Sequence, residues 1–89
     1  MNAILSVIGK DTIGILADVS VECAKYKANI TDVSQSILGE YFAMIMVVNI
    51  DKLNVEFTNF VDKMQEVGKK KSLEIHIMHE DIFNSMHKI

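Results

Sequence analysis

Proline is absent from this 89-residue sequence, cysteine occurs once, and there are only four glycines. The chain therefore has no proline- or glycine-rich linker, and its length allows one domain and no more. The lone Cys23 excludes an intrachain disulfide. It falls within an apolar helical pattern, where a single cysteine behaves as a small buried hydrophobic residue. We expect residues 1–89 to form one domain without disulfides.

Long apolar runs are absent as well. No stretch approaches the roughly 20 apolar residues that a membrane-spanning helix needs. The opening residues 1–8 lack the basic start and the long apolar segment of a signal peptide. The expected location is therefore the cytoplasm, with no membrane partner. Nine basic and twelve acidic residues give a net charge of −3, so no nucleic-acid partner is expected either.

The first half of the sequence contains two different apolar periods in succession. Residues 3–8 form a short apolar run that is typical of a central strand. Near Ile13 the spacing changes to that of an amphipathic helix. The apolar positions of this helix are Leu16, Val19, Cys23 and Tyr26. Asn29, which follows it, suits the left-handed backbone of a chain reversal.

The second half repeats this order of strand and helix. Residues 30–38 alternate in character, which predicts a half-exposed or edge strand. One face of that strand is expected to carry Thr31, Val33, Gln35 and Ile37. The remaining expected elements are a tight turn at Gly39 and Glu40, a strand at 41–50, a helix from Phe57 to Gly68, a strand at 72–78 and a short helix in the tail, residues 78–89.

Strand–helix–strand–strand–helix–strand is the order of two β–α–β halves of similar length. Right-handed crossovers in both halves lead to a ferredoxin-like βαββαβ sandwich of the α+β class. Such a sandwich has a four-stranded antiparallel sheet in the order 4-1-3-2, with two helices on one face. The apolar first and third strands fit its two central positions. The short C-terminal helix is an addition to this fold.

The first strand-to-helix turn, in "GKDTIGILADVS", is unusually polar and contains a costly glycine. In the first turn of a helix, Gly14 is about 1 kcal/mol less favourable than alanine. Asp11 or Thr12 can cap the helix. The first backbone N–H groups of a helix are unpaired and can hold a carboxylate, and Asp11 could hold an ammonium group. A free amino acid carries both of these groups.

The pattern D-x-x-G-I-L-A-D-V, followed by A-N-I-T-D before the second strand, resembles the ACT domain family over residues 3–78. Stand-alone bacterial members with a similar tail share the pattern, and so do the ACT modules of the glycine-cleavage repressor. The resemblance implies a regulatory domain without a cofactor that binds a small molecule, expected to be an amino acid. The ligand-binding positions it implies are Asp11, Thr12, Gly14, Ile15, Leu16 and Asn29.

Two positions depart from the family pattern. Many members carry proline where this chain has Ile13, and the serine-sensing members carry histidine where it has Gly9. The missing histidine removes one hydrogen-bond partner of the ligand and counts against serine. In the alternative interpretation, Asp11 is only a helix cap and Gly14 only allows close packing. The domain is then a ligand-free dimerisation or protein-interaction module that regulates a partner protein.

The expected edge strand predicts self-association. Unpaired N–H and C=O groups on the edge of the second strand can pair with a copy of the same strand. Two-fold pairing would form one eight-stranded sheet and bring the turn from Asp11 to Gly14 near the partner's Asn29. We therefore expect a homodimer formed through the second-strand edge.

Other residue groups indicate no further site. His76, His79 and His87 lack the tight spacing of a zinc motif. The acidic pairs have no nucleophile, oriented histidine or cofactor loop beside them, so neither a metal site nor an enzyme is expected. An RNA-binding sandwich of this topology needs aromatic residues on its first and third strands. Here Tyr41 and Phe42 are adjacent, so they point to opposite faces.

Overall fold

The computed structural model describes residues 1–10 and 13–86 of the chain. Strands and helices follow the predicted order, and a short third helix follows the fourth strand. The elements are β1 (Asn2–Lys10), α1 (Ile15–Lys25), β2 (Asn29–Leu38), β3 (Tyr41–Asn49), α2 (Phe57–Lys71), β4 (Leu73–His79) and α3 (Glu80–Met86). The predicted α+β class and βαββαβ order are confirmed.

The four strands form one antiparallel sheet in the order β2-β3-β1-β4, which is the predicted order read from the other edge. The central strands β1 and β3 pair along their whole length, from Asn2 opposite Asn49 to Lys10 opposite Tyr41. β2 lies at one edge of the sheet and β4 at the other. The prediction that the second strand is an edge strand is therefore confirmed.

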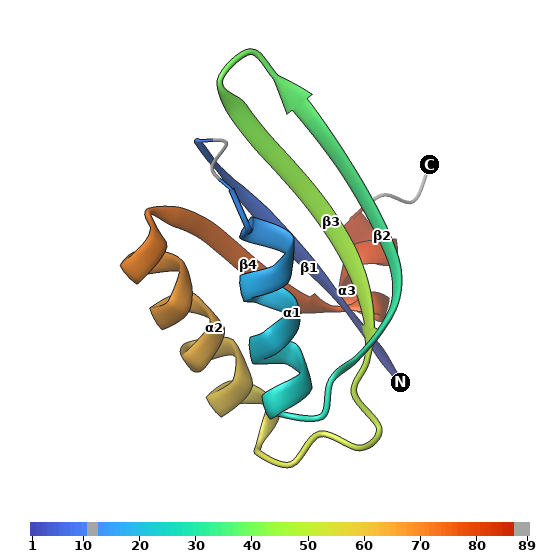
Figure 1. The fold of residues 1–89 in the computed structure, drawn as a ribbon. Helices are drawn as coiled ribbons and strands as arrows, with labels where there is room; N and C mark the ends of the chain where they lie inside the picture. The colour runs from blue at the N-terminus through green and yellow to red at the C-terminus, as the bar shows by residue number, and fades with distance from the viewer. Residues whose placement is uncertain (11–12, 87–89) are drawn as a thin grey trace.

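Helices α1 and α2 lie together on one face of the sheet and enclose the core against it (Figure 1). No polar or charged residue among those described is buried. The largest fully buried side chains are Phe60, Leu5, Met44, Met46, Met64, Val7, Val19, Val48 and Cys23. Burying a large apolar side chain contributes about 1.5–3 kcal/mol, so this single layer is the main source of stability.

Helix α1 begins later than predicted, at Ile15, because Gly14 occupies its N-cap position. No described side chain caps the helix. The predicted cap residues, Asp11 and Thr12, lie outside the described residues. The residue at the N-cap position is Gly14. The predicted apolar stripe is confirmed in the middle of the helix. The residues of α1 that are buried in the core are Ile15, Val19 and Cys23.

The chain reversal after α1 depends on Lys27, and the prediction of a left-handed Asn29 is wrong. Lys27 has φ 60°, whereas Asn29 already begins β2. The loop before α2 closes this helix end, because the Asn54 side chain donates to the Lys25 carbonyl at 3.1 Å and its backbone N–H donates to the Tyr26 carbonyl at 3.1 Å. Two carbonyls that a helix end leaves open are thereby satisfied.

Helix α2 continues past its predicted end at Gly68 to Lys71, and Ser72 is its C-cap with φ 59°. Gly68 is buried within the helix, where an added Cβ would lie 2.7 Å from the carbonyl oxygen of Leu73. The glycine therefore allows α2 to approach the β4 backbone closely. The lysine run 69–71 forms the last helical turn, where positive charge complements the helix dipole.

Strands β2 and β3 are joined by the predicted tight turn, in which Gly39 has φ 64°. Near the start of β2 the register shifts between Ile30 and Asp32, so Thr31 is an extra, bulged residue. The predicted alternation of faces is wrong at Thr31 for this reason. Its hydroxyl donates to the Val47 carbonyl of β3 at 3.2 Å.

The sheet face opposite to α1 and α2 is only partly covered. Figure 1 draws α3 behind β2 and β3, on that opposite side. Ile4 points to this face, since it pairs with Val47 and Met78, yet it is only 8% exposed. α3, which contacts β1 and β4, accounts for this burial. The apolar residues left exposed on the rest of this face are Ile8, Leu38, Tyr41 and Ile45.

The predicted tail helix is confirmed over Glu80–Met86, and residues 87–89 lie outside the described part of the chain. Its acidic residues Glu80 and Asp81 fall in the first turn, as expected from the helix dipole. Within the described residues, no helix has the length and apolar character needed to cross a membrane.

Two methionines, one buried and one exposed, test which residues belong to the core. Met64 is fully buried, whereas Met86 on α3 is 65% exposed. We expect Met64→Ala to lower the free energy of unfolding by about 2–5 kcal/mol, because it leaves a cavity. The matched change Met86→Ala should stay within about 0.5 kcal/mol. Urea unfolding followed by circular dichroism measures both, and equal losses would contradict the assignment.

Candidate functional site

The turn between β1 and α1 contains five of the six predicted ligand-binding positions. Of these, Asp11 and Thr12 lie outside the described residues. Gly14 has φ 86° and ψ 12°, a left-handed conformation that costs other residues about 1–2 kcal/mol. Apart from the adjoining backbone, no described atom lies within 4 Å of the Cβ that a substitution would add. Backbone conformation therefore favours glycine at this position, and the alternative reason, close packing of the helix within the protomer, finds no support. Close approach of a ligand or of a partner chain stays a prediction.

The first turn of α1 presents backbone N–H groups that no described side chain caps. The Asp18 N–H donates to the Gly14 carbonyl at 2.9 Å, so the amides that precede Asp18 have no acceptor within the helix. The Ile15 side chain is buried and Leu16 packs against the same core. These two residues fix the turn in place. Their amides lie at the positive end of the helix dipole, which favours an anion.

Lys71, at the end of α2, reaches the first turn of α1. Its Nζ lies 3.1 Å from Oδ2 of Asp18, and both side chains are somewhat under half exposed. An ion pair this exposed contributes about 0–1 kcal/mol to stability. The pair places one positive and one negative charge beside the first turn of α1, so it adds no net charge there. Sequence analysis missed this residue, because nothing in the local pattern links Lys71 to Asp18.

Gly9, the other glycine of this region, is required by packing. A Cβ at Gly9 would lie 2.6 Å from Cδ2 of Leu73 and 3.1 Å from the carbonyl oxygen of Ser72. Gly9 and Leu73 are register partners in β1 and β4. A side chain at the position where the serine-sensing pattern has histidine would therefore require Leu73 and the start of β4 to shift.

Asn29, the sixth predicted position, stands at the opposite end of α1 from Gly14. The helix has 11 residues, which correspond to about 16 Å of length. Asn29 is exposed at the start of β2 and lines an open hollow of ≈ 380 Å³. The other residues around this hollow are Ser20, Ala24, Lys27, Ala28 and Ile30. A single protomer therefore does not bring Asn29 to the β1–α1 turn.

The two described histidines, His76 and His79, do not lie together. His76 and His79 are three positions apart on β4, so they point to opposite faces of the sheet. His76 lies on the open face 3.5 Å from Glu74, and the His79 ring packs on Phe57 with centroids 4.2 Å apart. Within residues 1–10 and 13–86, no three His, Cys, Asp or Glu side chains are placed to hold a metal ion. The third histidine, His87, is not among these residues.

Cys23 is a core residue, as predicted. Burial raises the pKa of its thiol to about 11, and the neighbouring Glu22 charge adds to the shift. A thiol with this pKa stays protonated at neutral pH and is a poor nucleophile.

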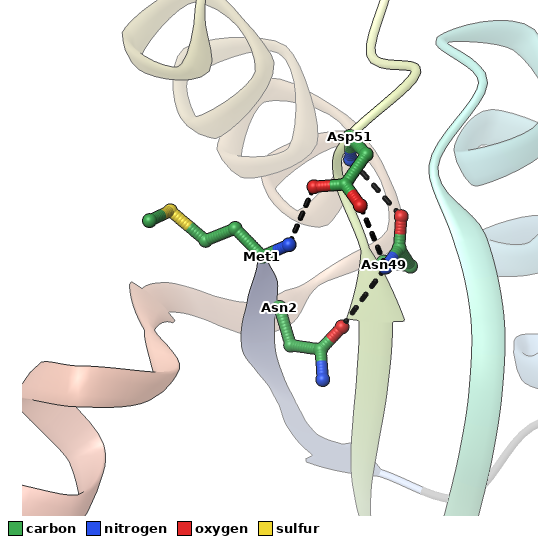
Figure 2. Close-up of polar contacts among 4 residues, drawn as sticks. All are labelled: Met1, Asn2, Asn49 and Asp51. Carbon is green, nitrogen blue, oxygen red and sulfur yellow. Dashed lines mark hydrogen bonds and ion pairs between the residues drawn. The ribbon is translucent and has the colours of Figure 1, made fainter.

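A polar cluster joins the start of β1 to the end of β3 (Figure 2). The Met1 ammonium group forms an ion pair with the Asp51 carboxylate. The Asn49 side-chain amide donates to Asp51 at 3.4 Å and to Asn2 at 3.3 Å. The hydrogen bond from the ammonium group, followed by that from Asn49, lowers the pKa of Asp51 below its ordinary value of 3.8. The polar groups satisfy one another, so this cluster fastens the end of the sheet.

Known proteins match this chain over nearly its whole length. The family model described as ACT domain matches residues 2–78, from the start of β1 to the last residues of β4. The chain belongs to the ACT domain family. The resemblance carried by the β1–α1 turn and by the entry into β2 is therefore confirmed.

Relatives of this ACT domain share its fold, and two of them also share its length. A UPF0237 protein of Listeria innocua is 44% identical over 89 residues, which is 100% of both chains. The solved ACT domain protein from Streptococcus pneumoniae is 40% identical with a TM-score of 0.82, and 93% of each chain is covered. The regulatory subunit of aspartate kinase from Thermus thermophilus shares the fold at 19% identity and a TM-score of 0.66, over 86% of this chain and 50% of that one.

Substitution of Gly14 tests the left-handed cap. We expect Gly14→Ala to lower the free energy of unfolding by about 1–2 kcal/mol, because alanine is strained at positive φ. Gly14→Asn should cost less, since asparagine tolerates this conformation. Urea unfolding of both variants measures the difference. If alanine is tolerated as well as asparagine, the cap is not left-handed.

The pH dependence of the Asp51 cluster has a definite sign. Because the pKa of Asp51 is lowered in the folded state, its stabilising effect is present above pH 3.8 and is lost as the pH falls through the folded pKa. An NMR titration of the carboxyl carbon should show a pKa below 3.8. Acetylation of the Met1 amine should raise that pKa toward the ordinary value, and Asn49→Ala should raise it less. If acetylation leaves the pKa of Asp51 unchanged, the ammonium group is not the main cause of its lowering.

Proposed function

We propose that residues 1–89 form one regulatory ACT domain that binds a small molecule, an amino acid, as a homodimer in the cytoplasm and catalyses no reaction. The observation that carries this proposal is the first turn of α1. The left-handed Gly14 starts the helix without a described capping side chain, so the first backbone N–H groups of α1 are available to an anion. A carboxylate is the group that such a turn accommodates best, and Asp11 would face the ammonium group of the ligand.

A second copy of the chain would complete the ligand site. β2 has a free edge, and two such edges related by a two-fold axis pair antiparallel. Because the two-fold axis reverses the direction of one copy, the N-terminal end of α1 in each copy would face the C-terminal end of α1 in the other. The partner subunit's Asn29 would then approach the Gly14 turn. A ligand held between the two copies stabilises the dimer, since it binds the assembled state.

Family membership supports a regulatory role over catalysis. The fold recurs in the regulatory subunit of aspartate kinase from Thermus thermophilus. In this proposal the ACT domain changes its association or stability with the concentration of a metabolite, and a partner protein responds to that change.

A second candidate function is supported by the open face of the sheet. Ile8, Leu38, Tyr41 and Ile45 are between 48% and 67% exposed there, and large exposed apolar patches mark interaction surfaces. The chain would then be a ligand-free module that dimerises or binds a regulated partner protein. This alternative needs no occupant at the Gly14 turn.

A thermal-shift panel of the twenty amino acids distinguishes the two functions. The sensing function predicts that one compound at about 100 times its Kd raises Tm by on the order of 10 °C, because ligand binding stabilises only the folded state. Asp11→Ala and Asn29→Ala should each abolish most of that rise. Asp62→Ala, which removes an exposed carboxylate on α2, is the matched control and should leave it intact.

Sedimentation velocity on the same samples completes this test. A dimer that responds to no amino acid would contradict the sensing function and support the interaction module. A ligand response from a monomer would contradict the contribution of the partner's Asn29.

A further inference from the structure

The free edge of β2 is partly occupied by one of its own side chains. The backbone N–H of Val33 donates to Oδ1 of Asp32 at 2.9 Å. An N–H that bonds to a side chain is not part of the ladder with β3. Val33 therefore turns its backbone groups toward the open edge, although it lies opposite Met46 of β3.

The regular part of β2 leaves three residues facing outward in this way. Inward and outward backbone groups alternate along an antiparallel edge strand. Since Val33 faces outward, Gln35 and Ile37 do so too. The hairpin turn at Gly39 limits this stretch at one end, and the bulge at Thr31 limits it at the other. Any pairing that uses this edge must therefore use the outward groups of Val33, Gln35 and Ile37.

We propose that the Asp32 carboxylate is an autoinhibitory latch on the self-pairing of β2, and that a second copy of β2 is the strand which displaces it. A pairing strand offers a backbone carbonyl to the Val33 N–H. The Asp32 carboxylate already accepts from that N–H and competes with the incoming carbonyl. Pairing thus requires the Asp32 side chain to turn away toward solvent. This inference rests on the proposed dimer and adds the contact that sets its strength.

The side chains around the edge are suited to a second copy in antiparallel orientation. Val33, Gln35 and Ile37 lie on the helix side, opposite the buried Met46, Met44 and Phe42 of β3. Ile37 is 61% exposed there. On the other side of the strand, Ser34 and Ser36 are small and uncharged and do not obstruct an approaching strand. Among the residues of the regular stretch, Asp32 alone carries charge.

The latch predicts a dimer that becomes tighter when Asp32 is removed. We expect Asp32→Ala to lower the Kd of the dimer by about tenfold. Each of the two chains then loses the hydrogen bond from Val33 N–H to Asp32, which competes with pairing between the strands. Asp32→Asn retains an acceptor oxygen without charge, so its Kd should lie between those of the wild-type chain and Asp32→Ala. Sedimentation equilibrium over a dilution series measures all three values.

Two control pairs separate the latch from charge and from other dimer surfaces. Glu74→Ala removes the same charge from an exposed position on the opposite edge strand, β4, and should leave Kd unchanged. Gln35→Pro removes an outward N–H, a change that an edge strand tolerates, and should prevent dimerisation without unfolding the domain. Gln35→Ala keeps the N–H and should still dimerise. Circular dichroism confirms the fold of each variant.

The outcomes distinguish failure of the latch from failure of the dimer. If Gln35→Pro prevents dimerisation but Asp32→Ala leaves Kd unchanged, the latch is overturned and the edge-paired dimer stands. If the wild-type chain is monomeric and Asp32→Ala dimerises, the latch is supported and the proposed native dimer is overturned. If Asp32→Ala stays monomeric, a second copy is not the strand that this edge accepts, and the proposal is overturned.

Discussion

The exposed hairpin end of this domain follows from a mismatch in length between α1 and the strands β2 and β3. β2 and β3 have 10 and 9 residues, or about 30 Å of extended chain. α1 has 11 residues, or about 16 Å of helix. A helix half as long as the strands covers only half of them. The other half contains the hairpin end, where Ile37, on the helix side of the sheet, is 61% exposed.

The same mismatch decides where the candidate site opens. Figure 1 shows the β2–β3 hairpin extending beyond the N-terminal end of α1. The turn at Gly14 therefore faces the uncovered half of the sheet, where Gln35, Ser36, Ile37 and Phe42 line a hollow of ≈ 400 Å³. In the proposed function, a molecule bound at this turn would gain a second wall from another chain. The proposed ligand site and the proposed β2 pairing would therefore share one uncovered surface, and Asp32 lies on its edge.

Local periodicity was enough to predict the core, because each apolar side chain is driven out of water by its own surface. Val19, Cys23, Phe60 and Met64 recur at helical spacing, and all four are fully buried. Turn and cap positions were predicted less well. Residue preference favoured Asp11, Asn29 and Gly68 for these positions, whereas the structure uses Gly14, Lys27 and Ser72. Lys27 and Ser72 have no local preference for positive φ and adopt it because the packed elements on either side require it.

The sequence by itself thus determined the fold class, the order of the strands, the core residues and the family, since all of these follow from local pattern and motif. Tertiary structure alone decided the bulge at Thr31, the contact of Lys71 with Asp18 and the outward turn of Val33. These features depend on the register between strands and on contacts between segments that are distant along the chain. No local spacing of residues encodes such a register, because it is set by how the whole sheet and its two helices fit together.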